Sequence, residues 1–524
     1  MMKYKAAQTL QALAKNAINL AQPNQLTPER LKTYVSEASD YKLLYGTERV
    51  TPEVIQALQE LAVEAQVFEK MADMQNGQIM NFIQNVPCEN RAVLHTATRD
   101  FFDDPRTSSA AKSATDLARK EVEKLHRFIE QLDVENSIDE ILMIGIGGSD
   151  LGPRAHFHAL EHLLRKKRQV HFISNVDPDE VNAALQKINA SRTLVVISSK
   201  SGSTLETNTN EQIVRNRFKE LGLDAQAHFV AITLPGSLLD DQKLYRQVFH
   251  LWEWVGGRFS TTAMSGGLLL AFAFGFSTYW EFLKGAHAID KLALEKDITR
   301  NIPLLMALLG IWNRNFLDYQ TLAIIAYSQG LHRYAAHLQQ LDMESNGKLI
   351  NKHAQKVDFQ TGPIIWGEPG TNAQHSFFQL LHQGTTVVPV SFIGFKKDQF
   401  AKDVQISGTS SQEKLLANLF AQSLALAGGQ KADNPNKFFP GNRPNSILLG
   451  EQLTPYALGS LLAIFEHKVA FQGFIWNINS FDQEGVQLGK VLANNILDYF
   501  KDLRSHKADT KVSPLIAAYL QHLL

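Results

Sequence analysis

Short apolar runs alternate with longer charged stretches between about residue 110 and residue 265. The apolar runs have the length of β-strands and span residues 141–144, 170–173, 194–197 and 229–232. The charged stretches between them, such as residues 180–188 and 206–221, have the length and polarity of helices. Strands that alternate with helices in this way are typical of βαβ units. The pattern therefore predicts a parallel α/β sheet in this part of the chain.

A second alternating block follows the first. Its helical patterns span residues 303–316, 333–342 and 412–426. Its strand-like runs span residues 322–326, 364–365 and 387–392. Two such blocks predict two parallel sheets, and ligands of such sheets bind beyond the carboxyl ends of the strands.

The two ends of the chain read as helical. Residues 51–68, for example, carry Val54, Leu58, Leu61 and Ala65 at helical spacing. We therefore expect an α/β protein of four parts. These are an N-terminal helical region that packs on the second domain (1–105), a first α/β domain (106–265), a second α/β domain (266–500) and a C-terminal helical arm (501–524).

Composition and charge exclude several classes of protein. The 524 residues include 52 basic and 53 acidic side chains, and the net charge of −1 predicts no nucleic-acid partner and no anionic membrane partner. Cys88 is the only cysteine, so no internal disulfide can form, which fits a reducing cytoplasm. The most apolar run, residues 264–276, is too short to cross a bilayer and predicts a buried helix.

A loop rich in hydroxyl groups follows the strand-like run at residues 194–197. It contains Ser199, Lys200, Ser201, Ser203 and Thr204, and a helical stretch comes next. At such a junction the backbone N–H groups and the helix dipole converge on an anion, and hydroxyls and a lysine add donors. The loop lacks Walker A spacing, so it suits a small monophosphate better than a nucleoside triphosphate. The alternative is a polar helix cap without a ligand.

A second loop of similar design follows the run at residues 141–144. It contains Gly145, Gly147, Gly148 and Ser149, which let a ligand approach the backbone closely. A dinucleotide-binding fingerprint is the alternative, but Asp150 stands at its third glycine position and would face the pyrophosphate. The two loops therefore predict opposite sides of one sugar-phosphate pocket.

Several longer motifs resemble one enzyme family, glucose-6-phosphate isomerase. They begin with Arg91-Ala-Val-Leu-His-Thr-Ala and Val255-Gly-Gly-Arg-Phe-Ser and continue with Gln340-Leu-Asp-Met-Glu-Ser-Asn-Gly-Lys. Gly367-Glu-Pro-Gly-Thr-Asn-Ala-Gln-His and Asn479-Ser-Phe-Asp-Gln-Glu-Gly-Val-Gln-Leu-Gly-Lys complete the set, in family order from about residue 80 to about residue 495. The resemblance implies two sugar-isomerase domains, interconversion of glucose 6-phosphate and fructose 6-phosphate without metal or cofactor, and a homodimer.

The resemblance also assigns catalytic roles. It makes Glu344 the base that moves a proton between C1 and C2, and a carboxylate suits that task. Arg258 matches the cation beside the enediolate, where a permanent charge is useful. His375 and Lys490 match the ring-opening residues. In relatives, the histidine that matches His375 reaches the active site of the neighbouring subunit. From the residues alone, Glu344 could be an exposed helix-end charge and Arg258 a structural arginine.

Substrate binding falls to a larger set by the same resemblance. The expected residues are Gly148, Ser149, Ser199, Lys200, Ser201, Thr204, Gly257, Gln340 and Gln483. The chain departs from the family pattern at Gln487, where Glu is usual, which removes a possible charge partner of Lys490. None of the matched residues forms a cluster with metal-ligand spacing.

Three other functions are open to a chain with these features. An isomerase that also accepts mannose 6-phosphate would share the motifs, although such relatives are usually shorter. A non-catalytic sugar-phosphate sensor would need the phosphate loops but not Glu344, Arg258, His375 and Lys490 together. A nicotinamide-dependent dehydrogenase is disfavoured by Asp150.

Overall fold

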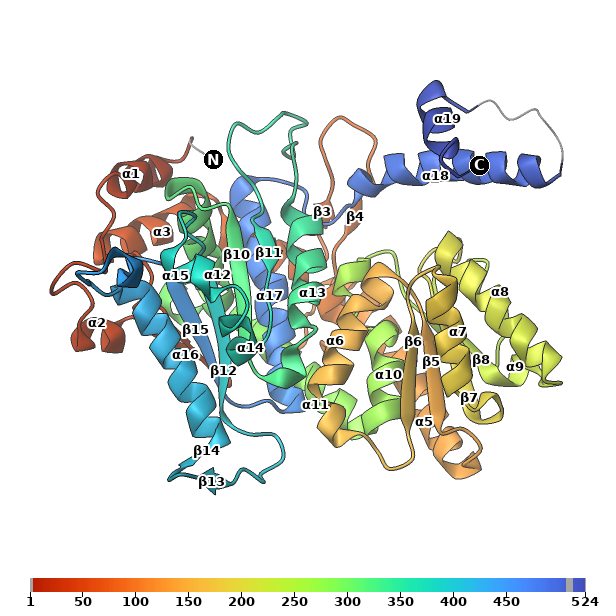
Figure 1. Cartoon of the computed structure of the whole chain (residues 1–524). Helices are drawn as coiled ribbons and strands as arrows, with labels where there is room; N and C mark the ends of the chain where they lie inside the picture. Colours follow the sequence, from red (N-terminus) through yellow and green to blue (C-terminus); the bar gives the residue numbers. More distant parts are fainter. Residues whose placement is uncertain (1–2, 506–511, 524) are drawn as a thin grey trace. The chain divides into compact units, whose positions relative to one another are not determined.

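The computed structural model describes residues 3–505 and 512–523 of the chain. They form two compact units, one that extends to Phe481 and one that begins at Asp482. Each unit is described by itself, and Figure 1 labels many of the helices and strands of both. The division at residues 105, 265 and 500 stays a prediction.

The first sheet contains the strands that the first alternating block predicts. The described residues form five parallel strands in the order β6-β5-β7-β8-β9. Their bounds are β5 Glu140–Ile144, β6 Gln169–Ile173, β7 Thr193–Ser198, β8 Phe229–Thr233 and β9 Gln247–His250. The four predicted strands are confirmed, and β9, which is short and has polar ends, was not predicted.

Helices cover both faces of this sheet. Alternate side chains of β5, β7 and β8 pack with α7 Pro178–Lys187 and α8 Leu205–Glu220 on one face. The remaining side chains of these strands pack with α5 Ser109–Glu135 and α10 Met264–Phe274 on the other face. Because both faces are buried, the strands are continuous apolar runs.

The second sheet joins predicted strands with strands that the pattern missed. Its order is β1-β2-β15-β12-β10-β11 within the described residues, and β15, β12, β10 and β11 are parallel. Their bounds are β1 Val35–Ala38, β2 Tyr41–Leu44, β10 Thr321–Tyr327, β11 Ile364–Trp366, β12 Val390–Lys397 and β15 Asn445–Gln452. The strand expected at 387–392 therefore begins and ends later, and β15 was not predicted.

The N-terminal region is not entirely helical, which corrects the expectation for residues 1 to about 100. The β1–β2 hairpin turns at Ser39, whose φ is 53°, and β2 pairs antiparallel with β15. Residues 51–68 form two helices because Gln66, at φ 54°, interrupts the helical path. The other elements here are α1 Lys5–Ala14, α2 Pro28–Thr33, α3 Pro52–Glu64, α4 Val67–Gln75, β3 Ile79–Asn81 and β4 Arg91–Ala92.

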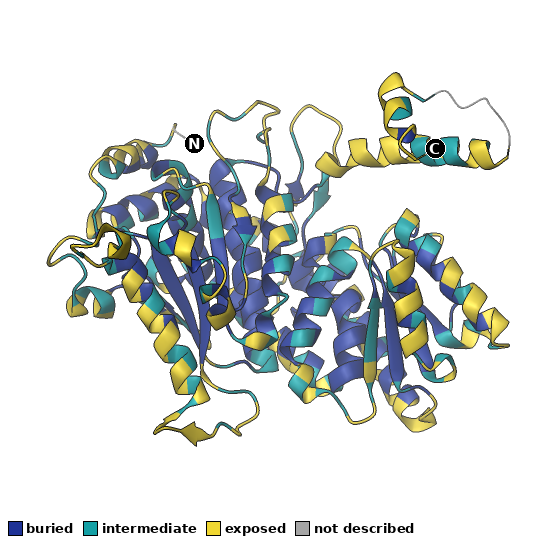
Figure 2. Cartoon of the chain, viewed as in Figure 1, coloured by how far each residue is buried: buried dark blue, intermediate teal, exposed yellow. Residues whose placement is uncertain are grey.

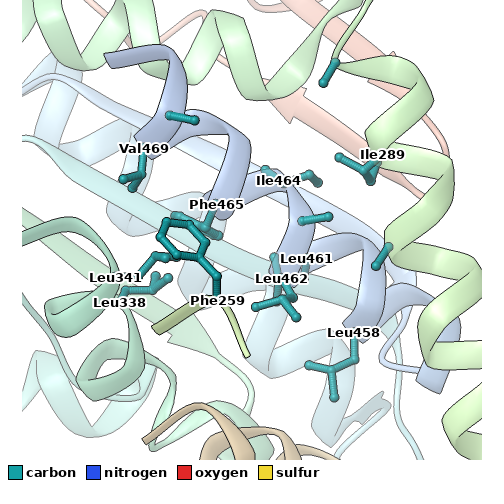
Figure 3. Packing of buried hydrophobic residues seen from close by; sticks show 14 of the residues in the cluster. Phe259, Ile289, Leu338, Leu341, Leu458, Leu461, Leu462, Ile464, Phe465 and Val469 are labelled. Carbon is teal, nitrogen blue, oxygen red and sulfur yellow. The ribbon is translucent and has the colours of Figure 1, made fainter. Parts of the chain in front are cut away.

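Buried helices form the centre of the first unit. They are α10, α11 Phe276–Leu292, α12 Ile302–Ile311 and α17 Pro455–Trp476. Every residue of α17 from Ala457 onward is buried (Figure 2), and Figure 3 shows Leu461 and Phe465 of α17 in this core. A Cβ built on Gly459 would lie 1.9 Å from the carbonyl oxygen of Phe282, so glycine allows α17 to touch α11. The predicted buried helix at residues 264–276 is confirmed over α10.

The helices of the structure also bear on whether the chain could cross a membrane. Among the described residues, no helix has both the length and the apolar character that a bilayer crossing requires.

The remaining elements connect these layers. Those of the first unit include α6 Leu151–Ala159, α9 Ala225–His228, α13 Tyr334–Leu338, the π-helix η9 Gln339–Glu344, α14 Gly370–Gln374, α15 Phe378–Gln383, β13 Gln405–Ile406, β14 Thr409–Ser410 and α16 Ser411–Gly428. The second unit contains η11 Glu484–Val486, α18 Gln487–Arg504 and α19 Pro514–Leu520. None of the described residues of α18 is buried.

Candidate active site

The two predicted phosphate loops lie side by side at the carboxyl edge of the first sheet. They follow β5 and β7, which are adjacent parallel strands. The strand order reverses at this point, and the crevice at such a switch point is the usual ligand position in an open α/β sheet. The structure therefore brings together Ser149 of one loop and Ser199 of the other, on strand ends that face the same way.

Glycines bring a third segment against these loops. A Cβ built on Gly148 would lie 2.2 Å from the carbonyl carbon of Gly257, so the two backbones touch. Gly147, at φ 59°, adopts a left-handed conformation, and its added Cβ would lie 3.2 Å from the Gln340 Nε2 atom. Four predicted substrate-binding or catalytic segments thus meet here, because Arg258 follows Gly257 and Glu344 follows Gln340.

The hydroxyl loop is held by hydrogen bonds among its own side chains. The Ser199 and Thr204 hydroxyls lie 3.0 Å apart, and the Ser203 hydroxyl donates to the Ser201 hydroxyl over 3.0 Å. The loop also precedes the 16-residue helix α8. A phosphate at this position would find hydroxyl donors and a helix N-terminus together.

Lys200 is turned toward the segment that carries Arg258. Its ammonium group donates to the carbonyl oxygens of Glu253 and Val255 over 3.0 and 2.9 Å. Burial, with a contribution from the nearby Arg91 charge, lowers the pKa of Lys200 to about 8. In this structure Lys200 therefore ties the hydroxyl loop to its neighbour, and its predicted contact with phosphate stays a prediction.

Arg258 is buried and held in one orientation. Its Nε donates to the Ser345 hydroxyl over 2.6 Å, and its Nη2 donates to the carbonyl oxygen of Ser480 over 2.7 Å. Its Nη1 lies 3.6 Å from the Glu344 Oε2 atom. A guanidinium fixed in this way is a preorganised positive charge beside a carboxylate.

Glu344 ends the π-helix η9, whose wider turn is a common feature of functional sites. Its Oε2 atom is buried and has no hydrogen-bond partner among the described residues, and the same holds for Oε1 of Gln340. The Glu344 side chain is nevertheless 24% exposed. A carboxylate that is accessible, close to an arginine and not engaged by a donor is available to accept a proton.

The other predicted site residues lie on other segments of the chain. His375 follows the short helix α14, beyond the carboxyl end of β11, and it is exposed. Its imidazole makes no hydrogen bond or ion pair with any residue in the described part of the chain. Gln483 and Lys490 belong to the second unit, where Lys490 is an exposed residue in the first turn of α18.

Several residues around the site were not predicted from the sequence. Ser345 and Ser480 hold Arg258, and the buried Lys468 donates to the Asp342 carboxylate of η9 over 2.7 Å. Asn346, just after η9, accepts from the Ser480 hydroxyl over 2.7 Å. A lysine within the apolar helix α17 is a signal that the sequence offers, because a buried lysine needs a partner.

The arrangement of the described side chains also bears on whether the protein could bind a metal ion. Among the residues described, no group of three or more His, Cys, Asp or Glu side chains is arranged to hold a metal ion.

Comparison with known proteins identifies close relatives. The sequence profile described as phosphoglucose isomerase matches residues 44–516. The chain is 59% identical to the glucose-6-phosphate isomerase of Protochlamydia amoebophila (strain UWE25) over 521 residues, which cover 99% of this chain and 96% of that protein. It is 51% identical to the glucose-6-phosphate isomerase of Desulfotalea psychrophila (strain LSv54 / DSM 12343) over 500 residues, which cover 94% and 93%.

A solved structure of a glucose-6-phosphate isomerase is also similar to this chain. The crystal structure of a glucose-6-phosphate isomerase from Chlamydia trachomatis D/UW-3/Cx superimposes with a TM-score of 0.95 and 46% sequence identity. The match covers 99% of this chain and 98% of that chain. The likeness therefore extends over nearly the whole chain.

Proposed function

This chain belongs to the phosphoglucose isomerase family, and from that premise we propose which of its residues carry out the reaction. The enzyme interconverts glucose 6-phosphate and fructose 6-phosphate, an aldose–ketose isomerisation. The fold is that of two sugar-isomerase domains with helical terminal regions. The roles below rest on the geometry of the first unit and on the motifs of the sequence.

Phosphate binding comes first. The hydroxyls of Ser199, Ser201 and Thr204, with Ser149 across the crevice, receive the phosphate at the carboxyl ends of β5 and β7. The N-terminus of α8 adds a favourable dipole. Lys200 contributes a positive charge from the same loop. This places the sugar beside Gly148, Gly257 and Gln340, where glycine backbones and one amide leave room for hydroxyl groups.

Ring opening precedes isomerisation. His375 delivers a proton to the ring oxygen and Lys490 takes up the proton of the C1 hydroxyl, so the C1–O5 bond breaks and an open-chain aldehyde forms. Gln483 binds the sugar hydroxyls from the same segment as Lys490. No other reactant enters this step, because the protons lost and gained balance.

Proton transfer between carbon atoms is the central step. Glu344 accepts the proton from C2 of the open-chain aldose, and the electron pair of that bond forms the C1–C2 double bond of an enediolate. Arg258 stabilises the negative oxygen that develops. A proton passes from the C2 hydroxyl to the C1 oxygen, and Glu344 then returns its own proton to C1, which leaves a carbonyl at C2 and gives the ketose. One carboxylate therefore serves both carbons without any external oxidant or reductant.

One observation carries this proposal. The Glu344 Oε2 atom is buried, has no hydrogen-bond donor among the described residues, and lies 3.6 Å from the Arg258 guanidinium. Carboxylates held only for stability are normally satisfied by donors. An unengaged carboxylate oxygen next to a fixed cation, on a π-helix that also carries Gln340, supports a base poised for substrate.

A homodimer completes the proposed site. We place His375 in the active site of the neighbouring subunit, and the exposed imidazole without a partner in its own unit supports this arrangement. A cytoplasmic location fits the single, exposed and unpaired Cys88.

A direct assay tests the function. Purified protein should convert fructose 6-phosphate to glucose 6-phosphate in a coupled assay, and a chelator should leave the rate unchanged. Mannose 6-phosphate serves as the comparison substrate and should react far more slowly. Loss of activity in chelator that a divalent ion restores would contradict metal-independent catalysis, and equal rates with both sugars would favour the dual-specificity alternative.

A further inference from the structure

The motif that begins at Arg91 has no role in the chemistry proposed above, although it lies beside the catalytic arginine. We define residues 91–99 as the anchor segment and residues 253–262 as the arginine turn, which carries Arg258. The anchor segment belongs to the N-terminal region of the chain. The arginine turn follows the last strand of the first sheet.

The anchor segment contacts the arginine turn at four points, in the same order along both segments. The guanidinium of Arg91 pairs with the Glu253 carboxylate, and the Leu94 N–H donates to the carbonyl oxygen of Trp254 over 3.0 Å. The contacts continue beyond Arg258: the His95 ring stacks on the Phe259 ring, and the Thr98 hydroxyl lies 2.7 Å from that of Thr262.

The stack of His95 on Phe259 is the contact nearest to Arg258. The two ring centroids lie 4.7 Å apart and the ring planes differ by 25°. Phe259 also packs near Leu338, which precedes the π-helix of Glu344, and near Leu341, which belongs to it (Figure 3). The position of Phe259 therefore affects both the arginine and the segment that carries the base.

The chemistry of His95 points to stacking and not to proton transfer. The side chain is fully buried, and neither ring nitrogen has a hydrogen-bond partner among the described residues. Burial, followed by the charges of Arg99 and His467, holds the pKa of His95 well below its usual range. This environment favours the neutral ring, which presents a flat aromatic face.

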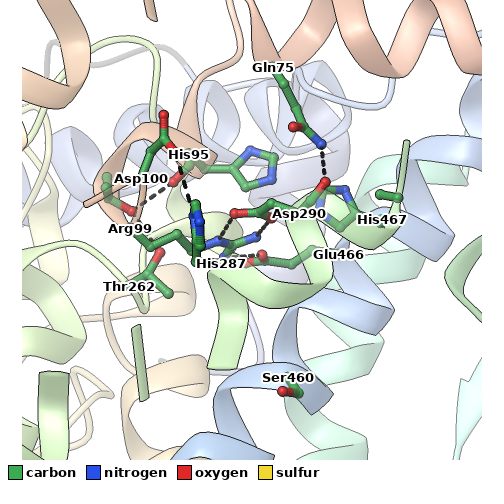
Figure 4. Close-up of polar contacts among 12 residues, drawn as sticks. Gln75, His95, Arg99, Asp100, Thr262, His287, Asp290, Ser460, Glu466 and His467 are labelled. Carbon is green, nitrogen blue, oxygen red and sulfur yellow. Dashed lines mark hydrogen bonds and ion pairs between the residues drawn. The ribbon is translucent and has the colours of Figure 1, made fainter. Parts of the chain in front are cut away.

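The far end of the anchor segment is fixed to the buried helices. The guanidinium of Arg99 donates twice to Asp290 of α11, over 2.8 and 2.7 Å, and once to Glu466 of α17, over 2.6 Å (Figure 4). The His467 ring lies 2.6 Å from the same Asp290 carboxylate. Bidentate charge-assisted bonds of this kind fix geometry as well as energy, so the anchor segment cannot shift independently of the core.

We propose that the anchor segment positions Arg258, and that His95 is the positioning residue through its stack on Phe259. His95 touches no substrate in this arrangement and is not a catalytic residue. The inference rests on the proposed role of Arg258 beside the enediolate. It also gives the N-terminal region a function in the active site of the same subunit.

Two substitutions at His95 separate stacking from chemistry. His95→Phe keeps the flat ring and removes the two nitrogens, so it should keep most of the turnover. His95→Ala removes the ring, and kcat should fall on the order of 10- to 100-fold, the usual cost of a displaced catalytic group. Because Arg258 acts on charge that develops in the transition state, KM should change little.

A double-mutant cycle tests whether the effect passes through Arg258. Arg258→Lys alone should lower kcat, and adding His95→Ala to it should lower kcat little further, because the arginine fork is already lost. Thr98→Val removes another contact between the two segments and should also lower kcat, which keeps the proposal testable if His95→Ala does not fold. Leu426→Ala, a truncation in a separate hydrophobic cluster, should lower thermal stability without lowering the kcat of folded enzyme.

The outcomes are distinguishable. If His95→Phe loses as much turnover as His95→Ala, the nitrogens of His95 matter and the stacking role is wrong. If His95→Ala lowers only thermal stability, or if its effect adds fully to that of Arg258→Lys, the anchor segment is structural and the proposal fails. If Arg258→Lys alone retains wild-type turnover, the proposed role of Arg258 fails instead, whatever His95 does.

Discussion

Replacing Glu344 by its isosteric amide tests the central step of the proposed mechanism. Glu344→Gln keeps the shape of the side chain but cannot accept a proton. Glu344 Oε2 makes no hydrogen bond among the described residues, and its approach to Arg258 is 3.6 Å, so few contacts are lost. We therefore expect the variant to fold and to retain affinity for the sugar phosphate.

The expected loss follows from the role of a general base. General acid–base catalysis contributes roughly 10²- to 10⁴-fold, which corresponds to about 3–5 kcal/mol at about 1.4 kcal/mol for each factor of ten. Glu344→Gln should therefore lose at least about 10²-fold in kcat. KM should change little, because the lost interaction belongs to the transition state.

Two measurements separate proton transfer from ring opening. The coupled assay gives the overall rate, and NMR in deuterated water follows exchange of the C2 proton with solvent. Glu344→Gln should lose both activities. His375→Ala should lose the overall rate but recover part of it when the substrate is supplied in open-chain form.

A second carboxylate, in the motif that begins at Gly367, provides the matched control. Glu368 is exposed and precedes α14, and Glu368→Gln should leave C2 exchange close to wild type. If Glu344→Gln still exchanged the C2 proton at a rate near that of the wild type, Glu344 could not be the base. Loss of exchange in Glu368→Gln would then make Glu368 the candidate.

Three further predictions concern binding, assembly and stability. The double variant Ser201→Ala/Thr204→Ala should raise KM strongly with little loss of stability, since each charge-assisted hydrogen bond to phosphate is worth about 1.5–3 kcal/mol. An unchanged KM would show that the phosphate binds at another place. Inactive His375→Ala and inactive Glu344→Gln proteins should regain activity when mixed, because one active site of each hybrid dimer carries neither defect. Demonstrated subunit exchange without recovered activity would refute an active site shared between subunits. Lys468→Met should lower the free energy of unfolding, measured by chemical denaturation, by about 3–5 kcal/mol, because it leaves Asp342 buried and unpaired. The loss should be smaller when Asp342→Leu is added, and equal losses in the single and double variants would refute the pairing argument.

The sequence pattern predicts the strands of the first sheet well, for a physical reason. β5, β7 and β8 are buried on both faces, so each is a continuous apolar run that stands out from its charged neighbours. β1 and β2 are four residues each and mix polar with apolar side chains, and they were read as helical. They are strands because β2 pairs with β15, about 400 residues away in the chain. A local sequence pattern cannot predict such a distant partner.

The candidate site shows the same limit more sharply. Resemblance to a family singled out Glu344 and Arg258, whereas the residues alone favoured an exposed helix-end charge and a structural arginine. Arg258 is held by Ser345 and Ser480, which are 87 and 222 residues away. The spacing of these serines carries no signal, because neither lies near Arg258 until the segments that carry them have packed together.

Buried charge is the part of the site that sequence reasoning could have reached. Glu466, His467 and Lys468 interrupt an otherwise apolar helix, and all three are buried. Charged groups are almost never fully buried without partners, so this triplet predicts oppositely charged residues on neighbouring elements. The partners are Arg99 of the anchor segment, Asp290 of α11 and Asp342 of η9. Charged residues in an apolar helix can therefore predict a buried network of ion pairs, but only the fold shows that this network joins α17 to the anchor segment and to the π-helix of the base.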